Sequence, residues 1–151
     1  MPERSDRPMD PISAFAFALE LKGVTEATFR EATGFGSENE VIEYKQQGPK
    51  GVTVIHKIPG NLKWQNINLK RGITDNIDLW TWRQKVIDGQ IEAARMNGSV
   101  VGYNENGNEV IRYNFINGWP CKWTSTGVNS QGAEVIIEEI EIAHEGLTRA
   151  S

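Results

Sequence analysis

The side chains most able to do chemistry are few in this chain. It has one cysteine, Cys121, and two histidines, His56 and His144, and each histidine is isolated in the sequence from another good pair of metal ligands. A zinc site normally needs several Cys, His or carboxylate ligands together, and no motif around Cys121 marks a nucleophile. We therefore expect no metal site, no cofactor and no catalytic residue. His144 is interpreted as a polar residue at a strand end.

Four carboxylates gather near the C-terminus, at Glu138, Glu139, Glu141 and Glu145. Paired carboxylates can act as acid and base when their environments separate their pKa values. On a strand, Glu139 and Glu141 share one face and Glu138 points to the other. An enzyme that uses them is the least supported interpretation. A solvated strand face, a polar lining and a subunit contact remain open.

Two loops and the five tryptophans have partial likeness to known ligand-binding patterns. The loop Gly34–Asn39 begins like a dinucleotide-binding loop, but Asn39 replaces its third glycine and no helix is expected to follow. The loop Asn104–Asn108 resembles part of a calcium loop, but Gly102 falls where the first carboxylate should be. The five tryptophans could stack nucleic-acid bases. The net charge of −4 argues against that, so we expect them to anchor a core or an interface.

The length of 151 residues is most simply that of one domain. We expect a flexible lead over residues 1–11 and a single domain over residues 12–149. The charged N-terminus lacks the pattern of an export signal, and the apolar run Ile12–Leu19 is too short to span a membrane. The lone cysteine excludes an intrachain disulfide and fits a reducing compartment. We therefore expect synthesis in the cytoplasm and no membrane anchor.

Alternating apolar residues predict strands in the first third of the chain. Strands are expected over Ala14–Leu21, Ala27–Thr33 and Glu40–Lys45, the first two forming a hairpin. The bulky face of the first strand should enter the core through Phe15, Phe17, Leu19 and Leu21. Gln46–Gly51 has the composition of a loop, and an extended stretch follows it. The region from Gln46 to Pro59 is the best candidate for an exposed, projecting segment.

The segment Pro59–Thr74 changes its apolar face along its length. Trp64 is apolar at an even position, whereas Ile67 and Leu69 are apolar at odd positions. Because side chains alternate with period two, the buried face must switch near Gln65 and Asn66, at a bulge or a bend. The switch fits an ordinary curved sheet, and it also fits a wall shared by several subunits.

One helix is expected over about residues 75–88. Thr74 or Asp75 can cap it, and Gly89 is a natural end. Its broad apolar side should combine Ile77, Trp80, Val86 and Ile87, with Leu79 adjacent.

The remaining pattern predicts a mainly β, antiparallel sandwich or barrel-like subunit. Two strands should form a hairpin with a type I′ turn at Asn106–Gly107. A corner follows at Asn117–Pro120. The later strands and loops are expected over Gly98–Asn104, Glu109–Ile116, Lys122–Thr126, a polar loop at Val128–Ala133, and Glu134–His144.

Several segments occur in the order found in a known family. PGNLKWQNINLKRGIT, followed by a helix containing LWTW, resembles the tail tube proteins of contractile bacteriophages and of phage-tail-like contractile injection systems. The resemblance continues in ATFREATGFGSENEVIEY, RYNFINGWPCKW and EVIIEEIEIAHEGLTR, and covers roughly residues 12–149.

This resemblance implies a structural function rather than an enzymatic one. It implies hexameric rings with a joined β-barrel lumen, stacked into a tube that sheath contraction drives through a target envelope. It also implies sheath, baseplate or spike, and tube-terminator partners, with effector protein or DNA in the lumen and a final location in a phage virion or tail-like particle. The residues expected at ring or subunit contacts are Gln46, Gln47, Lys50, Val52, Val54, His56, Lys63, Gln65, Asn66, Asn68, Lys70, Glu139 and Glu141.

A different class of function remains open on the residues alone. The chain could be a monomeric β-sandwich module that binds a ligand through the loop at residues 46–59. The choice between phage tail and injection system, the lumen charge and the strand faces that line the lumen are left open by the sequence.

Overall fold

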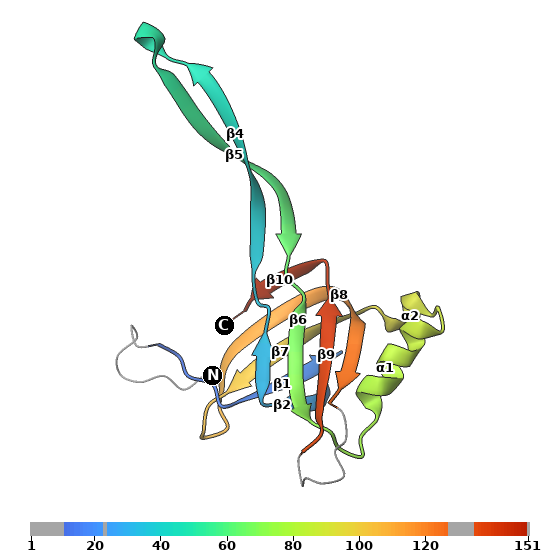
Figure 1. The fold of residues 1–151 in the computed structure, drawn as a ribbon. Helices are drawn as coiled ribbons and strands as arrows, with labels where there is room; N and C mark the ends of the chain where they lie inside the picture. The colour runs from blue at the N-terminus through green and yellow to red at the C-terminus, as the bar shows by residue number, and fades with distance from the viewer. Residues whose placement is uncertain (1–10, 23, 127–134, 151) are drawn as a thin grey trace.

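A computed structural model describes residues 11–22, 24–126 and 135–150. The expected lead over residues 1–11 and the loop Val128–Ala133 fall almost wholly outside these residues. The chain forms two packed β-layers, a pair of helices at one side and a long hairpin that projects from the body (Figure 1). The elements are β1 Ala16–Leu21, β2 Val24–Phe29, β3 Glu31–Thr33, β4 Ser37–Gln47, a 3-10 turn Pro49–Gly51, β5 Thr53–Trp64, β6 Ile67–Gly72, α1 Asp78–Ile87, α2 Ile91–Ala94, β7 Met96–Tyr103, β8 Glu109–Ser125, β9 Ile137–Ala143 and β10 Gly146–Arg149.

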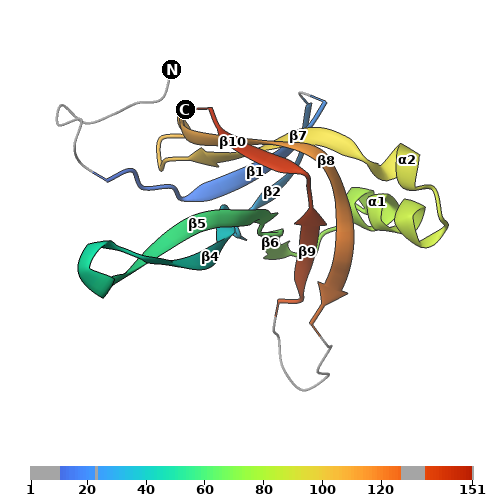
Figure 2. The ribbon, with the colours of Figure 1, turned by 90° about the horizontal axis from the view of Figure 1, so that it is seen from above.

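Strand β8 joins the two layers of the body. The strand order is β2-β1-β7-β8-β9-β6-β3, and β10 also pairs with β8. The first half of β8 pairs with β7 and β10, and Trp119–Ser125 pairs with β9. Seen from above, β8 curves from one layer into the other (Figure 2). The bend lies at Asn117, whose φ is 50°, so the expected corner is confirmed but lies inside one continuous strand.

The core lies between the two layers and under α1. It combines Leu19, Phe29, Val100 and Phe115 with Ile67, Leu69, Ile140 and Ile142 of the opposite layer. Helix α1 adds Leu79 and Trp82, and the Trp82 Nε1–H donates to Ala94 O at 2.7 Å. Fully burying one such large apolar side chain stabilises the fold by roughly 1.5–3 kcal/mol.

Helix α1 is confirmed, but it begins at Asp78 and buries only part of the expected side: Val86 packs against the core as expected, and so does Leu79, which was placed beside that side. Ile77, Trp80 and Ile87 are exposed, because Leu79 and Trp82 face the core instead. Neither Thr74 nor Asp75 caps the helix. The Asn76 side chain accepts from the Asp78 backbone N–H at 2.8 Å, and Gly89 ends the helix with φ +83°.

Several strand boundaries differ from the expected ones. Arg30 interrupts the stretch Ala27–Thr33, so β2 pairs with β1 while β3 pairs with β6. The last predicted strand gives β9, and β10 was not foreseen. Phe15 precedes β1 and is exposed, whereas Leu19 and Leu21 are buried as expected. The turn at Asn106–Gly107 is not type I′, because only Gly107 has positive φ.

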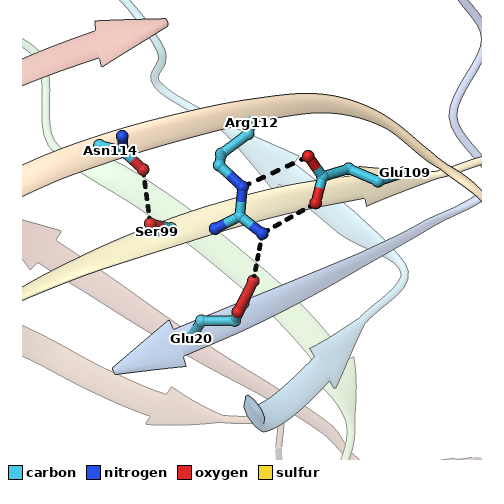
Figure 3. A network of polar contacts seen from close by, with 5 residues as sticks. All are labelled: Glu20, Ser99, Glu109, Arg112 and Asn114. Carbon is cyan, nitrogen blue, oxygen red and sulfur yellow. Dashed lines mark hydrogen bonds and ion pairs between the residues drawn. The ribbon is translucent and has the colours of Figure 1, made fainter. Parts of the chain in front are cut away.

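A polar network fastens β1 to β8 on the outer face of the body. Arg112 donates to Glu20 at 2.9 Å and to Glu109 at 2.8 Å, while the Ser99 hydroxyl donates to Asn114 (Figure 3). The hydrogen bond to Glu109 raises the pKa of Arg112, so the guanidinium stays charged. The network covers Ala18 and Val101 on neighbouring strands, both of which are buried.

Candidate functional site

The projecting hairpin, formed by β4 and β5, has no other element of the described chain packed against it. Strands β4 and β5 pair with each other over Ser37–Gln47 and Thr53–Trp64, and neither makes more than marginal contact with another element. Every residue of β4 is exposed. A two-stranded ribbon alone is marginally stable in water, and stable sheets need three strands or a packing surface. The hairpin therefore has the form of a segment that packs on another molecule.

The two faces of the hairpin differ in polarity. The cross-strand pairs Ile42–Ile58, Tyr44–His56 and Gln46–Val54 share one face. The rings of Tyr44 and His56 stack with centroids 6.2 Å apart. The opposite face carries the pairs Val41–Pro59, Glu43–Lys57, Lys45–Ile55 and Gln47–Thr53, so it mixes apolar residues with charged and polar ones. A ribbon that exposes apolar side chains on one face and, among charged residues, on the other has the pattern of an interaction surface.

The hairpin continues the β3–β6 pair across a joint. Thr33 opposes Asn68 below the joint and Ser37 opposes Trp64 above it, so the two ladders keep one register. The Gln65 backbone N–H donates to Gly36 O at 3.0 Å inside the gap. Gly34 has φ +94°, and a Cβ there would lie 2.0 Å from Asn66 O. Only glycine fits this position without strain or displacement.

The expected switch of the buried face at Gln65 and Asn66 is confirmed as a break between β5 and β6. A second irregularity, not foreseen, lies in the hairpin, where the register shifts between Asn39 and Val41. Phe35 stacks on Tyr113 at 4.4 Å and fixes the base of β4 to β8.

A polar hollow lies at the base of the hairpin. Lys63, Gln65, Asn66, Asn68 and Glu141 line it, with a volume of about 380 Å³. The Asn66 Nδ2–H donates to the Glu141 carboxylate at 2.9 Å. A second hollow, at the opposite end of the same sheet face, contains Lys70 and Glu139. These hollows are open and shallow, which suits surface contact better than enclosure of a small ligand.

One face of β6 and β9 carries alternating charges and amides. Asn68 lies opposite Glu141, and Lys70 opposite Glu139. Lys122 of β8 lies opposite Glu141 on the other side of β9, so Asn68, Glu141 and Lys122 form one row across the three strands. The expected alternation is confirmed, since Glu138 points the other way and is buried with Ile140. Because the core side is filled, this polar face is the side of the sheet that water can reach.

The buried partner of Glu138 was not foreseen. Arg71 Nε donates to the Glu138 carboxylate at 3.0 Å, both side chains are more than nine-tenths buried, and the guanidinium lies over the Phe29 ring. The sequence did indicate that Arg71 faces the core, because it follows Ile67 and Leu69 with the same period of two. A charge on the core side of a strand needs such a partner.

The histidines and the cysteine show no arrangement for catalysis. No group of three metal-ligating side chains occurs among the residues with described positions. Burial and a hydrogen bond to Glu141 raise the pKa of the Cys121 thiol to about 11, so it is a poor nucleophile at neutral pH. His144 is half-buried rather than a simple polar strand end: its ring lies 5.8 Å from that of Trp64.

The predicted contact residues therefore form three groups. The first group lies on the hairpin and comprises Gln46, Gln47, Val52, Val54 and His56, with Lys50 at the tip. The second group lines the hollow at the base of the hairpin and comprises Lys63, Gln65, Asn66, Asn68 and Glu141. The third group, Lys70 and Glu139, lines the second hollow. Sequence reasoning missed the exposed apolar residues Val41, Ile42, Tyr44, Ile55, Ile58 and Leu62, since apolar alternation is normally a sign of burial.

Two comparisons with known proteins bear on this site. Residues 13–148 match the family model described as T4-like virus tail tube protein gp19. None of the curated proteins matches the chain. No helix within the described part of the chain is long and apolar enough to cross a membrane.

Solved structures share the fold over nearly the whole chain. The sheath-tube complex of PVC, an extracellular contractile injection system, contains a chain with 20% identity and a TM-score of 0.79, covering 95% of this chain and 94% of that one. A chain of the anti-feeding prophage cap has 20% identity and a TM-score of 0.74, covering 98% and 96%. Hcp1 from Flavobacterium johnsoniae has 14% identity and a TM-score of 0.54, covering 90% and 95%.

Proposed function

Because the chain belongs to the T4-like virus tail tube family, whose members are structural components of phage tails and contractile injection systems, we propose that copies of it close into hexameric rings. The rings stack into a hollow tube inside a sheath. The subunit acts as a building part and not as an enzyme. It is made and assembled in the bacterial cytoplasm before it becomes part of the particle.

The observation that carries the proposal is the unpartnered hairpin. It exposes eight large apolar side chains, with fractions between 40% and 61%, on a ribbon that its own body does not cover: Val41, Ile42, Tyr44, Val52, Val54, Ile55, Ile58 and Leu62. Packing the ribbon on a neighbouring copy removes these side chains from water and supplies the surface that the ribbon lacks.

Ring closure is supported by two strand edges that pair with no further strand of the described chain, although α1 lies beside part of the β8 edge, where Arg83 Nη1 donates to Pro120 O at 3.2 Å. In the described residues, β3 pairs only with β6, and Trp119–Ser125 pairs only with β9. Joining the β3 edge of one copy to the β8 edge of the next hides both and makes a head-to-tail interface, which closes into a ring. The polar face of β6 and β9 then faces the channel.

The number six and the partners rest on similarity. A 15% identical chain with a TM-score of 0.74 comes from an anti-feeding prophage baseplate described as 6-fold symmetrised. Other similar chains come from a sheath-tube complex and a sheath/tube terminator. On these likenesses we propose sheath, baseplate and terminator partners, with effector protein or DNA as the cargo.

Electron microscopy of the purified protein, alone at high concentration and beside its cognate baseplate, tests the proposal. Rings with six-fold averages and stacked tubes are expected. Ile58→Asp, on the apolar face of the hairpin, should give a folded monomer that forms no tube. Thr53→Asp is the matched control, since it is exposed on the opposite face of the same strand. Wild-type monomers that persist beside the baseplate would contradict the proposal.

A further inference from the structure

His144 sits where the projecting hairpin meets the body. It follows β9, and its ring contacts Trp64 of β5 at 5.8 Å and Phe115 of β8 at 6.3 Å between centroids. Its Nε2 lies 3.0 Å from the carbonyl oxygen of Gln65, in the gap between β5 and β6. One side chain thus contacts the last residue of the hairpin, the joint and the core.

The geometry fixes which nitrogen of the neutral ring carries the hydrogen. The Gln65 carbonyl can only accept, so Nε2 carries a hydrogen, and in the neutral imidazole Nδ1 is the bare nitrogen. Nδ1 is buried and has no hydrogen-bond partner. A proton added at Nδ1 would place a new donor and a full charge at a buried position, which costs free energy.

No charged side chain compensates for that cost. Glu145 follows His144 in the chain and Lys63 precedes Trp64 in β5, and among the described residues neither forms an ion pair with His144. The Glu145 carboxylate accepts from Asn117 Nδ2 at 2.8 Å, and Glu141 of β9 is held by Asn66. Burial lowers the pKa of His144, and the backbone at Gln65 and Gly146 offsets part of that effect.

We propose that His144 is a pH-dependent latch that holds the base of the hairpin in place when neutral and releases it when protonated. The sign follows from linkage. A histidine with a lowered pKa stabilises the closed joint fully above its ordinary value of about 6.5, and this contribution is lost as the pH falls below that value. The consequence for assembly rests on the proposed function: mild acid would loosen the hairpin that packs on the next copy.

Hydrogen exchange of the monomer at pH 7.5 and pH 5.0, corrected for the intrinsic rates, tests the latch. Protection of the Gln65 amide, which donates to Gly36 O, should fall more than about threefold relative to that of Val100 in the core. His144→Gln can still donate to the carbonyl but does not titrate, so its protection should not depend on this pH change. His144→Phe keeps an aromatic ring in the site and should behave likewise.

His56→Gln is the matched control, because His56 lies on the exposed part of the hairpin and should leave the wild-type pH dependence intact. The latch is overturned if wild-type protection does not change, or if His144→Gln keeps the fall. Electron microscopy of the wild type at pH 7.5 tests the proposed tube assembly separately from the latch. Missing tubes would count against the proposed function without affecting the exchange result on the monomer.

Discussion

At the residue scale, the buried pair of Arg71 and Glu138 should be the ion pair whose disruption lowers the free energy of unfolding most. Arg71→Met leaves a buried carboxylate without its partner, which should cost about 3–5 kcal/mol in the free energy of unfolding. Urea denaturation measures this. Lys70→Met is the control, because its contact with Glu31 is long, at 4.0 Å, and solvent-exposed, and should matter by less than about 1 kcal/mol. Equal losses in the two variants would contradict the assignment.

Cys121 gives a second prediction at this scale. Since its thiol pKa is about 11, alkylation by iodoacetamide at pH 8 should be slow in the folded protein and fast in urea. Glu141→Gln removes a hydrogen-bonded negative charge 3.4 Å from the sulfur, so it should lower the pKa and speed the reaction. A rate that does not differ between folded and unfolded protein would refute the raised pKa.

At the element scale, the joint below the hairpin depends on Gly34. Gly34→Ala places a Cβ against a backbone oxygen in a positive-φ conformation, so we expect a loss of at least about 2 kcal/mol in unfolding free energy or a displaced hairpin. Gly51→Ala is the matched control. Gly51 also has positive φ, at +76°, but a Cβ there meets no atom within 4 Å, so only about 1 kcal/mol of backbone strain applies. Thermal unfolding of both variants distinguishes steric overlap from backbone strain.

At the scale of the whole molecule, assembly should change which bonds a protease can reach. The hairpin carries Lys45, Lys50 and Lys57, all exposed. Brief trypsin treatment of the monomer should therefore cut there before it cuts the body, and tubes should resist the same treatment. Mass spectrometry of the fragments locates the cuts. Equal cleavage in monomer and tube would place the hairpin outside the packed interface.

The sequence predicted the order of most strands and the position of α1, because local periodicity carries that information. It also predicted the break at Gln65 and Asn66, where the apolar phase changes. It predicted only part of the face of α1 that is buried. Ile77, Trp80 and Ile87 are apolar too, and only the packing of Leu79 and Trp82 on β8 and α2 decides between the faces.

The candidate site was harder to predict than the fold. The alternation at Val52 to Ile58 indicated an extended segment, but its partner, β4, was expected only over Glu40–Lys45 and was not expected to pair with it. The sequence predicted an exposed, projecting segment over Gln46–Pro59, but not that the ribbon extends from Ser37 to Trp64, because an exposed ribbon of that length is stable only with contacts that a single chain does not contain. The buried pairing of Arg71 with Glu138 was not predicted, because charged side chains are normally expected at the surface.

The shared register of β3–β6 and β4–β5 has a mechanical consequence. The backbone hydrogen bonds of an antiparallel ladder lie across the strands, so a pull or push along the strands loads many rungs together instead of opening them one after another. The rungs run in one register from Glu31–Lys70 in the body to Asn39–Leu62 in the hairpin. Both strands of the hairpin leave the body together, so a force along the hairpin passes through their two covalent backbones into β3 and β6. The β6–β9 ladder of the body then bears it in shear, with many rungs loaded together.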